Sequence, residues 1–335
     1  MTDDTTGKRP KIAIIASGGT LTALSSDPFE IRDYGEAGSL SAVDLIQRCG
    51  ALSDRFDFVA TECPSVPSFD IALPEWTALC RLCEKTLREE PELDGFVLTH
   101  GTGTLEETAF FLSLIWDFPV PLVVTGAQRP ASAMSSDGYM NFFQAACVAA
   151  HPAMREIGAA VVMHSEVHLP SEVTKTTTFG LDAFRSPDFG PIAQVVGGQT
   201  SFRRRAVSTP RFAELDWRTL KSLPRVDVVA TYSGADAATI EAAIAAGAKG
   251  IVTAGFAPGY VTSTQAQRLE RWIHEEDGIV VASTRTYGPV VPNTRNNGYG
   301  FIPSGPYLPQ KARILLQIAL SCGLHHDRIP ALFEL

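Results

Sequence analysis

The chain has 335 residues, of which 45% are hydrophobic and 19% charged, so it can form about two domains and has an ordinary globular composition. This length excludes a small disulfide-held scaffold, and this composition excludes disorder. Its 28 Lys and Arg against 37 Asp and Glu give a formal net charge of −9, which argues against nucleic acid and anionic membranes as partners.

Neither an export signal nor a membrane span is visible in the sequence. Residues Met1 to Pro10 are polar, and the apolar run Phe118 to Val124 is too short to cross a bilayer. We therefore expect a cytoplasmic protein. The six cysteines lack framework spacing and are interpreted as reduced thiols. Cys80 and Cys83 form a CxxC, but no second Cys or His pair lies near, so metal or redox chemistry is disfavoured there.

In the first part of the chain, short apolar runs rich in β-branched residues alternate with segments of helical periodicity. This alternation is typical of βαβ units and a parallel sheet. The amphipathic segment Trp76 to Leu87 is interpreted as a helix. The clearest helix is Leu105 to Trp116, where Thr104 and Glu107 predict a capping box. The predicted strands are Lys11 to Ala16, Gly95 to Thr99, Pro121 to Thr125 and Ala159 to Met163.

The stretch from Arg203 to Leu223 lacks sustained periodicity and is interpreted as a linker. A second series of strands and helices follows it. We therefore predict two parallel-sheet α/β domains, a larger one over 1–205 and a smaller one over 225–335, joined by the linker 206–224. The later predicted strands are Val226 to Tyr232, Gly250 to Phe256 and Gly278 to Arg285, and the helices are Ala235 to Ala246, Thr264 to Glu275 and Pro309 to Ser321.

Three polar, glycine-flanked clusters stand where predicted strands end. In an open parallel sheet these carboxyl ends face the crevice where ligands bind, so the clusters predict one site. The clusters are Ser17-Gly18-Gly19-Thr20, His100-Gly101-Thr102-Gly103-Thr104, and Gly126-Ala127-Gln128-Arg129-Pro130 continuing to Ser135-Ser136-Asp137-Gly138.

The first cluster has three possible interpretations. Paired glycines let the backbone N–H groups approach a ligand, which would make Gly19 part of an oxyanion hole beside the Thr20 hydroxyl. The same residues could form a plain turn. A phosphate cradle is disfavoured, because the sequence fits neither G-x-G-x-x-G nor the Walker pattern with its lysine.

The other candidate side chains also have structural alternatives. The Thr102 hydroxyl could meet a ligand near a helix N-terminus, or it could only satisfy a turn. Lys175, a lone lysine among threonines, could be desolvated and act on a neighbouring hydroxyl, although such a lysine is more often solvated. His100 is interpreted as a structural hydrogen-bonding histidine, since no acid stands at a spacing that would orient it.

Taken together, the clusters resemble the bacterial-type L-asparaginase and asparaginase/glutaminase family, and the resemblance covers nearly the whole chain. The order and spacing of the matching stretches make chance agreement very unlikely. These stretches are Ile14 to Thr20, Asp94 to Thr102, Leu105 to Ala109, Gly126 to Pro130, Ser136 to Gly138, Val173 to Lys175, Tyr299 to Phe301 and Pro309 to Arg313.

The resemblance implies a two-domain α/β enzyme, usually a homotetramer of intimate dimers, that cleaves an amide without a metal or organic cofactor. Thr20 would be the nucleophile that forms an acyl-enzyme, and Tyr34 the loop tyrosine that helps to take its proton. Thr102 and Lys175 match the threonine and lysine that activate a nucleophile or water. Ser68 matches a residue that holds the substrate carboxylate.

Three departures from the family pattern concern the substrate ammonium. Family members have Asp in the position of Gly103, where it completes a Thr-Lys-Asp relay and binds that ammonium. Phe69 replaces a residue that is commonly Gln or another polar group. In the segment where a neighbouring subunit often supplies an acid, Arg295 is the only charge.

Binding an ammonium in a closed pocket without a carboxylate is unfavourable by several kcal/mol. We therefore favour an amide substrate without a free α-ammonium, with apolar surface from Phe69 and with Arg295 and Arg129 suiting an anionic or neutral acyl group. Alternatively, an acid such as Glu36 replaces the missing Asp and the chain is an ordinary L-asparaginase. A non-catalytic small-molecule sensor and a nucleotide-binding module are hypotheses from other classes.

Overall fold

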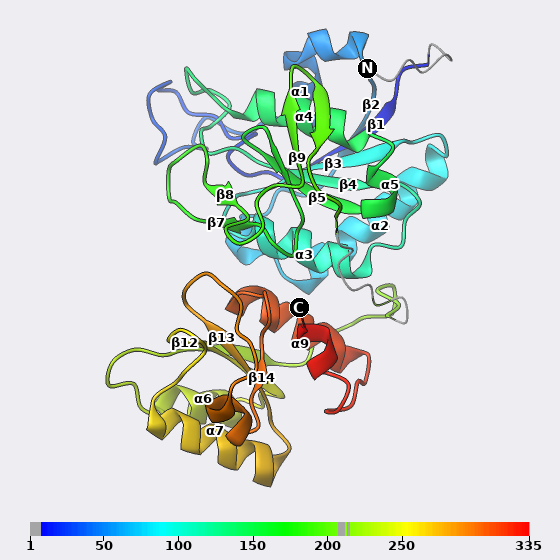
Figure 1. Ribbon diagram of the computed structural model, residues 1–335. Helices are drawn as coiled ribbons and strands as arrows, with labels where there is room; N and C mark the ends of the chain where they lie inside the picture. The colour runs from blue at the N-terminus through cyan, green and yellow to red at the C-terminus, as the bar shows by residue number, and fades with distance from the viewer. Residues whose placement is uncertain (1–7, 207–211, 213–214, 335) are drawn as a thin grey trace. The chain divides into compact units, whose positions relative to one another are not determined.

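The computed structural model describes residues 8–206, 212 and 215–334, which form two compact units, Met1–Thr209 and Pro210–Leu335 (Figure 1). Most of the predicted polar start, Met1 to Pro10, and part of the predicted linker 206–224 lie outside the described residues. Within that linker, the described Trp217 is 1% exposed, whereas its neighbours Asp216, Arg218 and Thr219 are exposed, so one aromatic side chain is packed in an otherwise solvated stretch.

The first unit is built on an eight-stranded mixed sheet of order β10-β9-β6-β5-β4-β3-β1-β2. The five strands from β5 to β2 pair in parallel, which confirms the parallel pairing predicted for β1, β3, β4 and β5. Strand β2 was not predicted from the sequence, and neither were β6, β9 and β10, which join through antiparallel pairs. The strands are β1 Lys11–Ala16, β2 Asp57–Glu62, β3 Gly95–Thr99, β4 Leu122–Thr125, β5 Ala159–Met163, β6 Glu166–His168, β9 Ala193–Val196 and β10 Gln199–Phe202, with a separate pair of β7 Thr174–Lys175 and β8 Phe184–Arg185.

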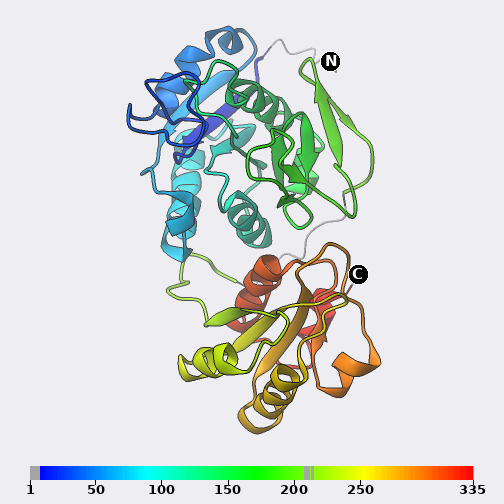
Figure 2. The same ribbon diagram turned by 90° about the vertical axis from the view of Figure 1, so that its left-hand side faces the viewer.

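Helices cover both faces of the parallel part of this sheet, which explains why β1, β3, β4 and β5 are buried apolar runs (Figure 2). One face packs on α1 and α4, and their side chains share a core with Ile12, Val97 and Val123. The other face carries α3, and α2 packs on α3, where the rings of Trp76 and Phe111 stack 4.2 Å apart. The helices are α1 Ala42–Arg48, α2 Leu73–Glu89, α3 Leu105–Ile115, α4 Gly138–Ala149 and α5 Met154–Ile157, with 3-10 turns at η1 Gly50–Asp54 and η2 Ser68–Asp70.

Helix α3 begins where the sequence predicts, but its capping box does not form. Thr104 is the N-cap residue and makes no side-chain cap hydrogen bond. Its hydroxyl instead donates to the backbone oxygen of Ser68 at 2.5 Å. The prediction was wrong because a tertiary acceptor competes with the local N–H groups, and this contact ties α3 to η2.

The second unit contains a four-stranded parallel sheet of order β11-β12-β13-β14. Helices α6 and α7 share a core with one face, where Ile240, Leu269 and Val280 meet, and α9 packs on the strands from the other face (Figure 1). The prediction of a larger and a smaller α/β unit is thus confirmed. The elements are β11 Val226–Ala230, α6 Ala238–Ala245, β12 Gly250–Gly255, α7 Ser263–Glu276, β13 Ile279–Thr284, α8 Thr294–Gly298, β14 Ile302–Pro303, α9 Pro309–Ser321 and η3 Pro330–Phe333.

The six cysteines are free thiols, and Cys80 and Cys83 are buried in α2. Burial raises the pKa of the Cys83 thiol well above its usual range. Over the described residues, no group of three or more His, Cys, Asp or Glu side chains is arranged to hold a metal ion. Within the same residues, no helix combines the length and apolar character needed to cross a membrane.

Candidate active site

The three clusters predicted from the sequence follow β1, β3 and β4, which are neighbours in the sheet order. The Ser17 hydroxyl, directly after β1, donates to the backbone oxygen of Thr99 at 2.7 Å. The His100 amide, directly after β3, donates to the backbone oxygen of Thr125 at 2.8 Å. The carboxyl ends of the three strands therefore bring the clusters to one edge of the sheet.

Gly19 is required by both its backbone conformation and its surroundings. Its φ of +85° lies in the left-handed region, and a Cβ there would come within 2.5 Å of the Gly101 backbone. The first two clusters therefore touch backbone to backbone. This contact fixes the position of Thr20, the next residue along the chain.

Thr20 and Tyr34 form the first hydroxyl pair of the site. Thr20 Oγ1 lies 2.8 Å from the Tyr34 hydroxyl, and the threonine is 6% exposed. Tyr34 stands on a loop that closes on itself, since the Gly35 amide donates to the backbone oxygen of Leu24 at 2.8 Å. A buried threonine hydroxyl paired with a second hydroxyl is a possible nucleophile with a proton acceptor.

Glu36, the alternative acid considered from the sequence, serves this loop. Its carboxylate accepts from the Ser25 hydroxyl at 3.0 Å and from the Ser26 amide at 2.8 Å. These hydrogen bonds, the Ser26 amide first, lower the pKa of Glu36. The carboxylate therefore holds the loop that carries Tyr34.

Thr102 and Lys175 form the second pair. Lys175, at the end of β7, donates from Nζ to Thr102 Oγ1 at 2.7 Å. Burial lowers the pKa of Lys175, while the negative charge of Glu106 opposes that shift. A half-buried lysine directed at a hydroxyl can take part in proton transfer more readily than a solvated one.

Ser68, Phe69 and Gly103 lie near one another beside these pairs. Ser68 starts η2, and a Cβ on Gly103 would stand 2.9 Å from its Oγ. Phe69 is 77% exposed, so its ring is available to a ligand or to another protein surface. Asp70 stands in the same turn η2 as Ser68 and Phe69, and the specificity argued from Phe69 and Gly103 stays a prediction.

The third cluster folds around Asp137. Its carboxylate accepts from the Gln128 and Arg129 amides at 3.0 Å and from Asn141 Nδ2 at 3.1 Å. The Arg129 guanidinium donates to Ser135 Oγ at 2.5 Å within its own loop. The Arg129 guanidinium is therefore hydrogen-bonded within its own loop.

His100 is fully buried, and its Nδ1 lies 2.8 Å from the backbone oxygen of Gly101. Burial lowers the pKa of His100 to about 4. Both features agree with the structural role predicted for it.

Arg295 belongs to the second unit, on α8, where its guanidinium lies over the ring of Tyr260 at 5.3 Å. Its assignment to the site remains a prediction.

Glu106 was not selected from the sequence. It stands in the first turn of α3 beside Glu107, and acids at that position are interpreted as ordinary partners of the helix dipole. Its position four residues after Thr102 was the only feature of the sequence that could have pointed to Glu106 as a residue near the site.

Comparisons with known proteins agree with this architecture. Residues 11–208 match the family model "Asparaginase, N-terminal", and residues 225–333 match "Glutaminase/Asparaginase C-terminal domain". A protein named probable periplasmic L-asparaginase, from Haemophilus influenzae, is 34% identical over 97% of this chain and 93% of its own length. L-asparaginase 2 of Escherichia coli is 32% identical over 97% and 93% of the two chains.

Among solved structures, that of a probable cytoplasmic L-asparaginase from Campylobacter jejuni superposes with a TM-score of 0.89. It is 30% identical and covers 97% of this chain and 99% of its own. The relatives are named L-asparaginases, which are hydrolases acting on C–N amide bonds, and the class of this chain follows from its similarity to them over nearly its whole length. The chain belongs to the asparaginase family.

Proposed function

We propose that this protein hydrolyses a C–N amide bond through a covalent acyl-enzyme on Thr20. The observation that carries the proposal is the 2.8 Å contact between Thr20 Oγ1 and the Tyr34 hydroxyl, next to the glycine turn. Thr20 Oγ1 attacks the amide carbonyl while Tyr34 takes its proton and passes it to the leaving nitrogen. The C–N bond then breaks and ammonia or an amine departs.

In the second half-reaction, water attacks the ester carbonyl of the acyl-enzyme, releases a carboxylic acid and restores the Thr20 hydroxyl. Lys175, whose Nζ donates to Thr102 Oγ1 at 2.7 Å, is the second proton-transfer group in this proposal. The lowered pKa of Lys175 supports this role, because more of the lysine is neutral at a given pH. The Gly19 turn presents backbone N–H groups that could stabilise the developing oxyanion.

The preferred substrate in our proposal lacks a free α-ammonium, for example an N-substituted asparagine, a cyclic amide or imide, or a dicarboxylic acid monoamide. Position 103 is a glycine next to Ser68 Oγ, position 69 is phenylalanine, and the Glu36 carboxylate is held by Ser25 and Ser26. A substrate ammonium would therefore lose its water without gaining a carboxylate from these residues.

L-Asparagine itself is the second candidate substrate, because the relatives from H. influenzae, E. coli and C. jejuni carry L-asparaginase names. The two candidate substrates, L-asparagine and an amide without a free α-ammonium, predict different effects of placing an aspartate at position 103. Under our proposal, Gly103→Asp raises kcat/KM on L-asparagine by roughly 10- to 100-fold, as expected for a charge-assisted hydrogen bond, and impairs the native reaction.

The experiment measures ammonia and amine release over asparagine, glutamine, N-acylated asparagines, cyclic amides and monoamides. Gly103→Ala is the matched control for Gly103→Asp, since both add a Cβ within 2.9 Å of Ser68 Oγ and only one adds a carboxylate. If Gly103→Asp and Gly103→Ala behave alike on every substrate, the argument from the ammonium fails. Thr20→Ala should abolish turnover, and near wild-type turnover in that variant would refute the nucleophile assignment.

We propose a cytoplasmic location as well. One relative is named periplasmic and one solved structure cytoplasmic, so the relatives alone do not decide it. Fractionation of the native cells with compartment markers would test it, and recovery of the protein with the periplasmic marker would contradict it.

A further inference from the structure

The hairpin that carries Lys175 is separate from the main sheet of the first unit. Strands β7 and β8 form a two-stranded sheet of their own, in which Lys175 pairs with Phe184. Each strand has only two residues. A two-stranded hairpin is marginally stable alone, so the 2.7 Å contact from Lys175 Nζ to Thr102 Oγ1 depends on contacts that hold the hairpin in place.

The third cluster holds the loop between β7 and β8. Gln128 Nε2 donates to the backbone oxygens of Thr178 and Gly180 at 3.1 and 3.2 Å. The Gln128 residue is 7% exposed, so these hydrogen bonds are largely shielded from water. They fix the tip of the hairpin, and the end of β8 must be held by other contacts.

A buried histidine of the main sheet contacts that end of β8. His168 is the last residue of β6 and is fully buried, and its Nδ1 lies 3.0 Å from Ser186 Oγ. Ser186 directly follows β8 and is 4% exposed. Strand β6 pairs with β5 and β9, whereas β8 pairs with β7. The hydrogen bond between these two side chains therefore joins the hairpin to the main sheet.

Glu166 lies beside the other ring nitrogen of His168. The two residues stand two apart on β6, so their side chains share one face of the strand. Glu166 Oε2 is 3.4 Å from His168 Nε2, which has no hydrogen-bond partner within the described part of the chain. The carboxylate favours the neutral tautomer with its proton on Nε2. His168 Nδ1 is then an acceptor, and the Ser186 hydroxyl is the donor.

We propose that His168 is a positioning residue for Lys175. Its hydrogen bond to Ser186 holds β8 against the main sheet, and β8 pairs with the strand that directs Lys175 at Thr102. The inference rests on the proposed function, in which Lys175 transfers protons. Loss of this hydrogen bond should lower kcat, because Lys175 Nζ moves away from the hydroxyl. It should leave KM nearly unchanged, because Ser68, the residue assigned to the substrate carboxylate, stands on η2.

Substitutions at both ends separate the hydrogen bond from the packing. In His168→Asn the amide stands as far from the backbone as Nδ1 did, so the contact with Ser186 is kept. In His168→Leu the site is filled with apolar atoms and the contact is lost. Ser186→Ala removes the same contact from the other side. Because both act on one hydrogen bond, the double variant His168→Leu/Ser186→Ala should lose no more activity than the more impaired single variant.

The matched control is Ser113→Ala in the same unit. The Ser113 hydroxyl is also buried and donates to a backbone oxygen, that of Phe110 at 2.7 Å, within α3. This variant removes a buried serine hydroxyl without touching the hairpin. It should match wild type in kcat and in the hairpin measurement below.

The first measurement is hydrogen exchange of the full-length protein by mass spectrometry. Amide exchange over residues 174–186 should be roughly 10-fold faster in His168→Leu and Ser186→Ala, as expected for the loss of one buried hydrogen bond. In His168→Asn it should stay close to wild type. Unchanged exchange over 174–186, or an equal acceleration across the whole first unit, would overturn the proposal.

The second measurement is steady-state kinetics on the amide that wild type hydrolyses fastest in the substrate panel. In His168→Leu and Ser186→Ala, kcat should fall roughly 10- to 100-fold with little change in KM, and His168→Asn should recover most of the loss. Faster exchange without a fall in kcat would overturn the positioning role. Hydrogen exchange needs no turnover, so a wild-type protein inactive on every amide would contradict the proposed function and leave the exchange test of the hairpin contact intact.

Discussion

At the scale of single residues, the burial of His100 leads us to predict how the free energy of unfolding depends on pH. Burial holds the pKa of His100 at about 4, below the 6.5 of an unfolded chain. As the pH falls, the histidine of the unfolded chain therefore takes up its proton at a higher pH than the buried histidine of the folded chain. The part of the free energy of unfolding that is present above pH 6.5 is lost progressively down to about pH 4. The loss attributable to His100 should be about 3 kcal/mol over that window.

His100→Leu removes this titration, so the free energy of unfolding should fall less steeply between these pH values than in wild type. Urea unfolding at several pH values measures the difference. His326→Gln is the control, because it replaces a histidine of the same chain whose side chain is exposed. Parallel curves for wild type and His100→Leu would contradict the assignment.

The sequence identified the site residues that stand next to glycines at strand ends. Thr20 and Thr102 were selected for that reason, and the structure pairs them with Tyr34 and Lys175. Other partnerships could not be predicted, because they depend on tertiary contacts. Nothing local indicates that Glu36 holds the Tyr34 loop, or that the Thr104 hydroxyl donates to the Ser68 backbone oxygen instead of capping α3.

At the scale of elements, Asp137 should determine whether the loops around the site fold. Its carboxylate accepts from the Gln128 and Arg129 amides and from Asn141. The loop that it organises also holds the Tyr34 loop, since the Ala131 amide donates to the Ala23 backbone oxygen at 2.9 Å. Asp137→Ala should lower the free energy of unfolding by roughly 2–3 kcal/mol, because donors of a partly buried charged group lose their acceptor.

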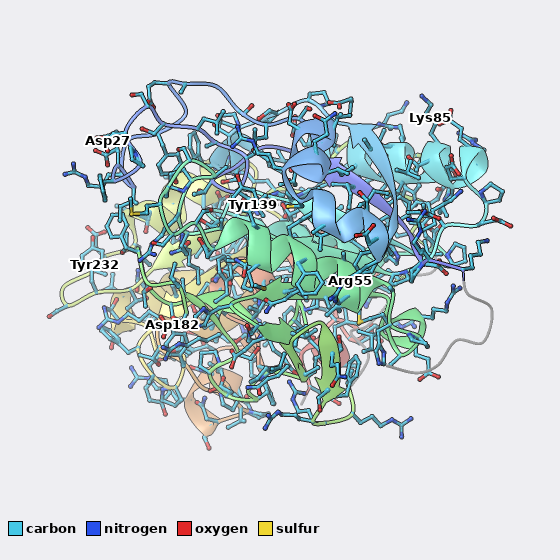
Figure 3. The ribbon with its side chains drawn as sticks, turned by 90° about the horizontal axis from the view of Figure 1, so that it is seen from above. Asp27, Arg55, Lys85, Tyr139, Asp182 and Tyr232 are labelled. Carbon is cyan, nitrogen blue, oxygen red and sulfur yellow. The ribbon has the colours of Figure 1, made fainter. Side chains whose placement is uncertain are left out.

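Asp27→Ala is the matched control in urea unfolding. Asp27 accepts from the Phe29 amide at 2.8 Å on an exposed loop at the edge of the first unit (Figure 3). Its removal should change stability by about 0.5 kcal/mol or less, because water replaces the lost acceptor. A similar loss in both variants would mean that Asp137 does not organise the loop.

Elements with a continuous buried apolar run were predicted with the right bounds, as β1, β3 and β5 show. The missed strands lack that signal. Strand β2 is mostly half-buried or exposed, and β7 and β8 have only two residues each, so pairing partners far along the chain decide their structure. Helix α1 was missed although Ser41 and Asp44 form a capping box, because its apolar stripe is short.

At the scale of the whole molecule, we predict the homotetramer that the family resemblance implies. Phe29, Phe69 and Met134 of the first unit are 72%, 77% and 74% exposed. Phe29 and Met134 lie on adjoining loops, since the Met134 amide donates to the Pro28 backbone oxygen at 3.1 Å. Large exposed apolar side chains on loops next to a site favour burial against another protein surface.

Each copy also carries a net charge of −9, so assembly must overcome repulsion between like-charged chains. Salt screens this repulsion and leaves apolar burial intact, so the assembly should be at least as stable at high ionic strength. Sedimentation equilibrium at micromolar concentration should give the mass of four 36.0 kDa chains, at low and at high salt. A species of one chain, or a tetramer that dissociates when salt is raised, would show that apolar contacts do not drive this assembly.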